Sequence, residues 1–209
     1  DLASKKLNNL TVGWKSVKNT INGSFSHDGQ YITFMGSQKD LEDWDIFVTH
    51  WNGNKWEEPV NLTGPNGKRD EDPKFSPVTN KIIYKENGVV ATIGFNGKPE
   101  YFSPGSMPYF LPDGNSYLFE QAGDIYLNSS KKISKMYAGD GLKSYYPIAL
   151  NQKEFLYTRV QNSKHDGIML GFTNGSKSIP YFFNNDQWDS SDPFPYQDGK
   201  KYIFLVSGD

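Results

Sequence analysis

Two acidic clusters each end at an Asp-Pro step. One reads Asp70-Glu-Asp72-Pro, and the other reads Asp189-Ser-Ser-Asp192-Pro. Carboxylates grouped in this way suit a hard cation, which takes oxygen ligands, or an acid/base pair of the kind that cleaves glycosidic bonds. The structural alternative is a carboxylate that accepts hydrogen bonds from backbone amides where a strand begins. Neither cluster forms an EF-hand loop, because no glycine and distal glutamate follow in register.

Three tryptophans lie in polar loop segments beside charged residues: Trp14, Trp44 and Trp188. A flat aromatic ring next to carboxylates suits stacking on a sugar, whose hydroxyl groups can donate hydrogen bonds to the carboxylates. The alternative is that each ring covers a cleft between two packed sheets. Trp51 and Trp56 bracket a hairpin turn instead, so we expect them to form a structural cross-strand pair.

Arg69, Tyr146 and His165 fall in similar loops and are further candidate ligand contacts. The other histidines, His27 and His50, fall in a turn and on an outer strand, which argues against a metal site built from several histidines. The chain has no cysteine, no Gly-x-Ser-x-Gly elbow and no glycine-rich phosphate loop. We therefore assign no catalytic residue, no metal ligand and no cofactor. Calcium is the candidate ion if the acidic clusters bind a cation.

A phrase of the form Pro-x-apolar-x-x-Asp-Gly, followed by an alternating strand, recurs with variations along the chain. Its five copies begin at Gly23, Pro73, Pro108, Pro147 and Pro193, at intervals of 35 to 50 residues. A repeat of this period, with strands on both sides of each turn, indicates a β-propeller, in which small sheets are arranged radially.

The third unit shows the expected pattern of four strands, at 106–111, 117–120, 124–127 and 132–134. Asn-Gly pairs at Asn52, Asn96 and Asn174 mark hairpin turns in other units. The sequence predicts one all-β domain over 1–209, a five-bladed propeller of four-stranded antiparallel blades. The blades cover roughly 20–63, 70–103, 106–136, 144–183, and 190–209 completed by 1–11. N-terminal strands would thus close the ring. The alternative is a fragment of a six- or seven-bladed propeller.

The long loops of such a propeller gather on one face, opposite the short Asp-Gly and Asn-Gly turns. They cover 11–20, 36–44, 63–72, 137–146, 160–166 and 184–192. All the candidate contacts named above lie in these loops, and loops on a rigid sheet are where binding residues usually occur. We expect this face to bind the ligand, with Asp72 and Asp192 at the mouth of the central channel.

Composition excludes several classes of function. The formal net charge is −2 and only two residues are arginine, which argues against a nucleic-acid partner. No run of 18 apolar residues could span a membrane. The N-terminus lacks the order of a secretion signal, although a mature end after cleavage would look the same. We expect a monomer or a module of a larger envelope protein.

The Pro-x-Phe-Ser-Pro-Asp-Gly phrase and the Asp-Ile-Tyr third strand resemble the TolB-type (WD-like) bacterial propeller repeat. The resemblance is clearest at 23–34, 71–86, 106–127 and 192–206, and it is weakest in the fourth unit, where Ala149-Leu-Asn-Gln-Lys lacks both Pro and Asp-Gly. It implies a periplasmic or secreted bacterial scaffold or binder, because only a few such proteins are lyases or peptidase-associated propellers.

The combined expectation is a non-catalytic binding module that holds a glycan or a partner protein on the long-loop face. Its predicted contacts are Trp14, Trp44, Arg69, Asp72, Tyr146, His165, Trp188 and Asp192. The alternative is a carbohydrate-active enzyme in which Asp72 and Asp192, with Glu71, act as acid and base. A third hypothesis is a purely structural module of a larger envelope protein.

Overall fold

The computed structural model describes residues 9–39, 43–136, 142–160, 166–182, 188–196 and 201–208, apart from the side chains at 188, 195–196 and 201–208. The first sheet contains β1 (Asn19–Phe25), β2 (Tyr31–Ser37), β3 (Asp45–His50) and β4 (Val60–Asn61). The second contains β5 (Asp70–Phe75), β6 (Ile82–Glu86), β7 (Val89–Ile93) and β8 (Glu100–Pro104).

The third sheet contains β9 (Ser106–Phe110), β10 (Tyr117–Gln121), β11 (Asp124–Ser129) and β12 (Lys132–Lys135). The fourth contains β13 (Ser144–Ala149), β14 (Glu154–Val160), β15 (Asp166–Phe172) and β16 (Ile179–Phe182). β17 (Trp188–Tyr196) and β18 (Lys201–Gly208) form a hairpin. The described part of the chain is all-β and contains no helix, as predicted.

The turn between β6 and β7 uses residues that tolerate a positive φ. Asn87 and Gly88 join β6 to β7, with φ of 46° and 79°. Two consecutive residues in this conformation give the turn type that matches the right-handed twist of paired strands. The predicted Trp51–Trp56 pair is confirmed, because the two residues form an isolated antiparallel bridge with ring centroids 5.4 Å apart.

The hydrophobic core lies between successive sheets. Ile46, Ile82 and Tyr84 belong to one cluster between the first and second sheets and are fully buried. Phe119 packs with Ile83 between the second and third sheets. Bulky side chains between blades remove apolar area from water and hold the sheets at fixed positions.

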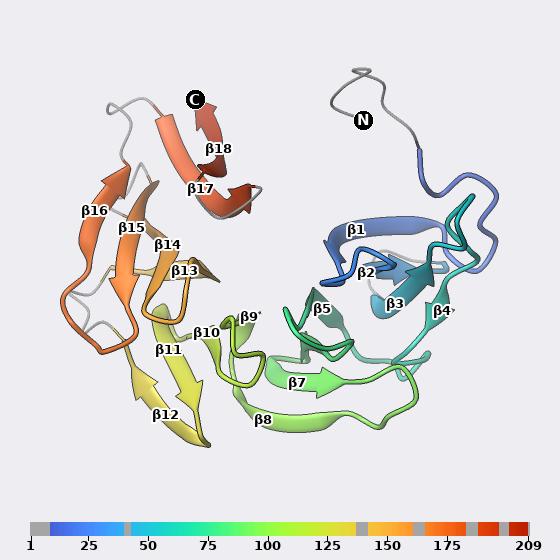
Figure 1. The fold of residues 1–209 in the computed structure, drawn as a ribbon, viewed down its shortest axis with the longest axis horizontal. Helices are drawn as coiled ribbons and strands as arrows, with labels where there is room; N and C mark the ends of the chain where they lie inside the picture. The colour runs from blue at the N-terminus through green and yellow to red at the C-terminus, as the bar shows by residue number, and fades with distance from the viewer. Residues whose placement is uncertain are drawn as a thin grey trace.

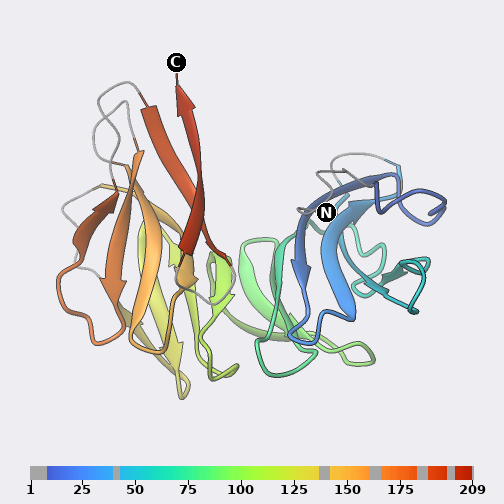
Figure 2. The same cartoon turned by 45° about the horizontal axis from the view of Figure 1, so that its top comes forward.

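The sheets are arranged in an arc with the first strand of each innermost (Figure 1). β1, β5, β9, β13 and β17 contact one another in succession. Figure 2 shows the β17–β18 hairpin and the first sheet on either side of an opening. No strand pairing in the described part joins the two. The predicted closing strands depend on residues 1–8, which lie outside the described part, so ring closure and the blade count stay predictions.

No described helix is long and apolar enough to cross a membrane.

Candidate functional site

Each of the five innermost strands contains one non-glycine residue with a left-handed backbone. The φ angles lie between 50° and 55° at Asn22, Asp72, Met107, Tyr146 and Asp192. Each of these residues immediately precedes the first residue of a sequence repeat. We call this set the axial ring. Left-handed residues other than glycine, asparagine and aspartate are strained, and such strain concentrates at functional sites.

A β-bulge at the same position of every innermost strand explains the shared conformation. In all five pairings, two residues of the first strand lie opposite one residue of the second strand. The extra residue bends the strand and redirects a side chain. The single opposing residue is aromatic in every case: Phe34, Tyr84, Phe119, Tyr157 and Phe204.

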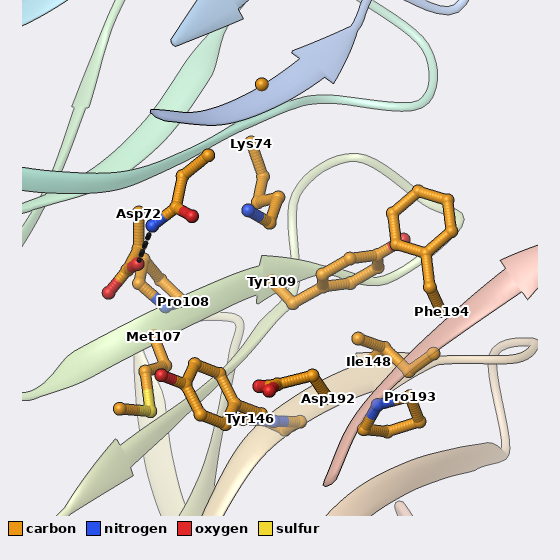
Figure 3. A pocket seen from close by; sticks show the side chains of 13 residues that line it. Asp72, Lys74, Met107, Pro108, Tyr109, Tyr146, Ile148, Asp192, Pro193 and Phe194 are labelled. Carbon is orange, nitrogen blue, oxygen red and sulfur yellow. Dashed lines mark hydrogen bonds between the residues drawn. The ribbon is translucent and has the colours of Figure 1, made fainter. Parts of the chain in front are cut away.

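The axial ring lines a cavity of about 340 Å³ where the five strands converge. Figure 3 shows the side chains of Asp72, Lys74, Tyr146 and Asp192 around this space. The remaining walls are mostly apolar and include Met107, Pro108, Tyr109, Ile148, Pro193 and Phe194. We call this space the axial cavity. A small apolar pocket with a few converging polar groups is the usual form of a ligand site.

The titratable groups of the axial cavity are poorly solvated. Burial raises the pKa of the Asp72 carboxyl, and the nearby Lys74 ammonium opposes this change. Burial also raises the pKa of Asp192, while a hydrogen bond from Ser191 lowers it. The pKa of Lys74 is lowered by burial, against the charges of Asp72 and Asp192. Burial and the same two carboxylates raise the pKa of Tyr146. Low solvation strengthens any charged contact that a ligand makes here.

A second cavity of about 550 Å³ adjoins the axial cavity on the side of the short Asp-Gly turns. The two cavities share Gly23, Lys74, Tyr109 and Phe194. The second cavity also contains Phe25, which is 62% exposed. The sequence predicts only short turns on this face, but the exposed aromatic rings of Phe25 and Phe194 lie there.

Three of the eight predicted contacts, Asp72, Tyr146 and Asp192, come together in the axial cavity. Arg69 does not line it, and its Nε lies 2.6 Å from Oε1 of Glu71. His165 lies outside the described residues. Trp188 begins β17, and its side chain is not described.

Trp14 and Trp44 do not lie at the axial cavity, which corrects their predicted placement. The Trp14 ring stacks on Phe34 with centroids 5.4 Å apart and planes 9° from parallel. Trp44 is only 5% exposed and belongs to the core between the first two sheets. Trp44 fits the alternative of a ring between two packed sheets, whereas Trp14 packs on apolar side chains of the first sheet. Each contact removes apolar area from water.

Four residues that line the axial cavity are not among the predicted contacts: Asn22, Lys74, Met107 and Tyr109. The repeat pattern could have identified two of the four, Asn22 and Met107. They precede the first and third repeats, as Asp72 and Asp192 precede the second and fifth. Lys74 and Tyr109 lie two residues further along β5 and β9, beyond the bulge, and line the same cavity.

The described residues contain no group of three or more His, Cys, Asp or Glu side chains placed to hold a metal ion. Calcium, which takes six to eight oxygen ligands, therefore gains no support from the described part of the chain.

The sequence matches no protein-family model and no curated protein. Similar solved structures do exist. A TolB protein from Agrobacterium tumefaciens has a TM-score of 0.73 and 15% identity, over 91% of this chain and 71% of that one. TolB from Acinetobacter baumannii has a TM-score of 0.66 and 18% identity, over 86% of this chain and 50% of that one. The chain thus has a TolB-like β-propeller fold.

An oligogalacturonate lyase from Vibrio parahaemolyticus is also similar, with a TM-score of 0.67 and 11% identity. The match covers 92% of this chain and 60% of the lyase. At these identities the likeness concerns the fold, and function has to be argued from the site.

Proposed function

We propose that this chain is a non-catalytic binding propeller of the bacterial envelope, periplasmic or secreted, which holds a segment of a partner protein in the axial cavity. The observation that carries the proposal is the convergence of five bulged strands, each with a left-handed residue, on one cavity. Asn and Asp tolerate this conformation, but Met107 and Tyr146 are strained by about 1–2 kcal/mol each. A role in ligand binding explains why strained residues lie at the axis.

The lining of the axial cavity favours a polypeptide over a glycan. Glycan binding was predicted from exposed tryptophan rings, and two of those rings cover core residues instead. The cavity combines apolar walls with opposite charges, from Lys74 and the two aspartates. Mixed charged and apolar surface suits protein side chains, whose aliphatic parts and charged ends both need partners.

Propellers of this shape are compatible with protein partners. One similar structure, with a TM-score of 0.56 and 11% identity over 68% of this chain, is a nidogen/laminin complex. For this chain the partner is a proposal, as are the five-blade count, the closure by residues 1–11 and the monomeric or modular state.

The experiment that tests the proposal is selection of displayed random peptides on the wild-type protein, with counter-selection on a variant that combines Asp72→Asn and Asp192→Asn. Asparagine tolerates a left-handed backbone, as Asn22 shows at the equivalent position. We expect selected peptides to bind the double variant at least about tenfold more weakly, because hydrogen bonds to charged groups contribute about 1.5–3 kcal/mol.

The matched control is Glu100→Gln, which neutralises a carboxylate on the outer strand β8. This change should leave peptide affinity unaltered. If every selected peptide binds the double variant as tightly as the wild type, the axial cavity is not the binding site. A parallel glycan array tests the alternative ligand.

A carbohydrate-active enzyme is the second candidate. The raised pKa of Asp72 and Asp192 favours it, because a general acid works best when its pKa lies closer to the working pH than that of an ordinary carboxyl group. One similar structure is an oligogalacturonate lyase in complex with manganese. Turnover of polygalacturonate that is lost in Asp192→Asn would support the enzyme and contradict the non-catalytic proposal.

A further inference from the structure

Two carboxylates face the axial cavity without an ion-pair partner. No ion pair between described residues includes Asp72, Asp192 or Lys74. Oδ1 of Asp72 accepts one hydrogen bond, from Nδ2 of Asn22 at 3.1 Å. Oδ2 of Asp192 accepts one from the Ser191 hydroxyl at 3.0 Å. Since a carboxylate has about four acceptor positions, both retain capacity for a ligand.

The adjacent Glu71 is a carboxylate whose charge is balanced by cations within the chain. Its two oxygens form ion pairs with Arg69 and Lys85. These two cations lower the pKa of Glu71 despite burial, whereas the pKa of Asp72 is raised. The neighbouring carboxylates therefore differ in their ion pairs, and the carboxylate without an ion pair lines the cavity.

The rest of the cavity suits an aliphatic chain that ends in a positive charge. With both aspartates and Lys74 ionised, the lining has a formal charge of −1, which one monovalent cation neutralises. The ammonium of Lys74 is hydrogen-bonded to the Pro73 carbonyl oxygen at 3.4 Å. Tyr146 is 36% exposed and offers an aromatic ring beside the carboxylates, and aromatic faces attract cations.

We propose that the axial cavity binds an alkyl-ammonium group, such as the side chain of a lysine in the partner. The ammonium donates hydrogen bonds to Asp72 and Asp192, and its methylene groups pack on Tyr146 and Met107. This assignment rests on the proposed binding function and specifies its chemistry. A divalent metal fits less well, because the described residues supply no third acidic ligand and the walls are largely apolar.

The four methionines allow a direct test by NMR of ¹³C-labelled methionine methyl groups. Met107 lines the axial cavity, whereas Met136 and Met169 are buried in a core cluster away from it. The probes are Nα-acetyl-lysine methylamide, the matched norleucine derivative, which lacks the ammonium, and n-pentylamine. We expect the lysine probe to shift the Met107 signal saturably and to leave Met136 and Met169 unchanged.

The norleucine probe should bind at least about tenfold more weakly, and Asp192→Asn should weaken the lysine probe by about the same factor. Tyr146→Leu should also weaken binding, whereas Tyr146→Phe, which keeps the ring, should not. Binding of n-pentylamine as tight as that of the lysine probe would support the ammonium chemistry with a free alkylamine as its source.

Equal binding of the lysine and norleucine probes, or no saturable Met107 shift with either amine, would overturn the assignment. Displayed peptides that lack lysine, yet shift Met107 and depend on Asp72 and Asp192, would overturn it while leaving the proposed function intact. A selection that yields no cavity-dependent peptide would instead count against the proposed function.

Discussion

At the residue scale, the axial ring combines side chains that tolerate a left-handed backbone with others that do not. Asn22, Asp72 and Asp192 have short polar side chains that can hydrogen-bond locally, whereas Met107 and Tyr146 do not. Met107 and Tyr146 therefore have most of the backbone strain in the axial ring. Since each sits at a bulge that the sheet imposes, the strain is relieved by changing the residue and not by moving the backbone.

We predict that Met107→Asn leaves the free energy of unfolding unchanged or raises it by up to about 1 kcal/mol, because relief of strain offsets the lost thioether contacts. The same change at Met169, a buried residue of β15 without a positive φ, should cost about 2 kcal/mol or more. Denaturant titration measures both. A loss at Met107 as large as that at Met169 would show that strain is unimportant there.

Asp70 makes stability depend on pH. It is fully buried, and burial is the largest cause that raises its pKa to about 7, with the charges of Glu86 and Asp45 adding to the effect. The folded protein therefore binds more protons than the unfolded chain between about pH 4 and pH 7. The stability that Asp70 contributes is highest at acidic pH and falls as the pH rises through this interval.

The variant Asp70→Ser tests this dependence with a residue that the fold already accepts. Ser144 and Ser190 occupy the equivalent positions of β13 and β17 and are buried. We expect the variant to be more stable than the wild type above pH 7, by up to about 4 kcal/mol. The difference should shrink toward pH 4. Unfolding measured across this range would contradict the prediction if the difference were constant.

Asp113→Asn is a control for which we expect the opposite pH dependence of stability. Burial raises the pKa of Asp113, but hydrogen bonds from Ser116 and Asn115 outweigh it, so the net pKa is lowered. Loss of this carboxylate should destabilise the protein at neutral pH, and the effect should diminish as the pH falls.

Part of the site was predictable from the sequence at this scale. Asp72 and Asp192 were placed near the axis because they precede innermost strands, and both line the cavity. Trp44 was misplaced because its sequence neighbours are polar, whereas its burial depends on the second sheet packing against it. Side-chain burial of this kind depends on the relative position of two sheets, which sequence periodicity does not specify.

At the element scale, glycines in the strands leave room for phenylalanine rings. A β-carbon at Gly36 would lie 2.6 Å from the Phe47 ring and 2.7 Å from a Val17 methyl group. A β-carbon at Gly171 would likewise clash with the Phe155 ring. These contacts fix how strands β2 and β15 pack, since interiors at crystal-like density do not accept an extra methyl group without movement.

Gly36→Ala should therefore lower the free energy of unfolding by about 1–3 kcal/mol, because it overpacks the space between Phe47 and Val17. Gly94→Ala is the matched control, since nothing lies within 4 Å of a β-carbon there. Thermal unfolding of the control should be within about 0.5 kcal/mol of the wild type. Equal effects of the two substitutions would contradict the packing argument.

The sequence predicted most strands of the described sheets but not their bulges. The predicted second strand at 117–120 corresponds to β10, and the predicted third strand at 124–127 to β11. A bulge is a property of the pairing of two strands, so alternation within one strand does not reveal it. An aromatic residue such as Tyr84 or Tyr157 lies opposite each bulge. In the sequence, this shared feature becomes visible only when the five repeats are aligned.

At the scale of the whole molecule, ring closure is the largest untested prediction. The inner strands contact one another from β1 to β17, and the opening in Figure 1 separates β18 from the first sheet. A free strand edge is a site of unwanted pairing, which a closed ring avoids. Closure by residues 1–11 would pair the N-terminal strand with β18.

Dipolar broadening in continuous-wave EPR spectra can test closure, because the chain contains no native cysteine. With spin labels on Ala3→Cys and Ser207→Cys, a closed ring should give strong dipolar broadening, since paired strands lie about 4.7–4.9 Å apart. The two singly labelled variants provide the reference spectra. A doubly labelled spectrum equal to the sum of the single ones would indicate an open arc in solution.

The central claim is that a partner segment binds where the five bulged strands meet. The most direct measurement is photo-cross-linking of a selected peptide that bears a benzophenone group, with the modified residues identified by mass spectrometry. We predict cross-links to axial-cavity residues, above all Met107, Tyr109 and Tyr146. Cross-links confined to the outer strands β8 and β12, or to the Trp14 segment, would contradict the claim.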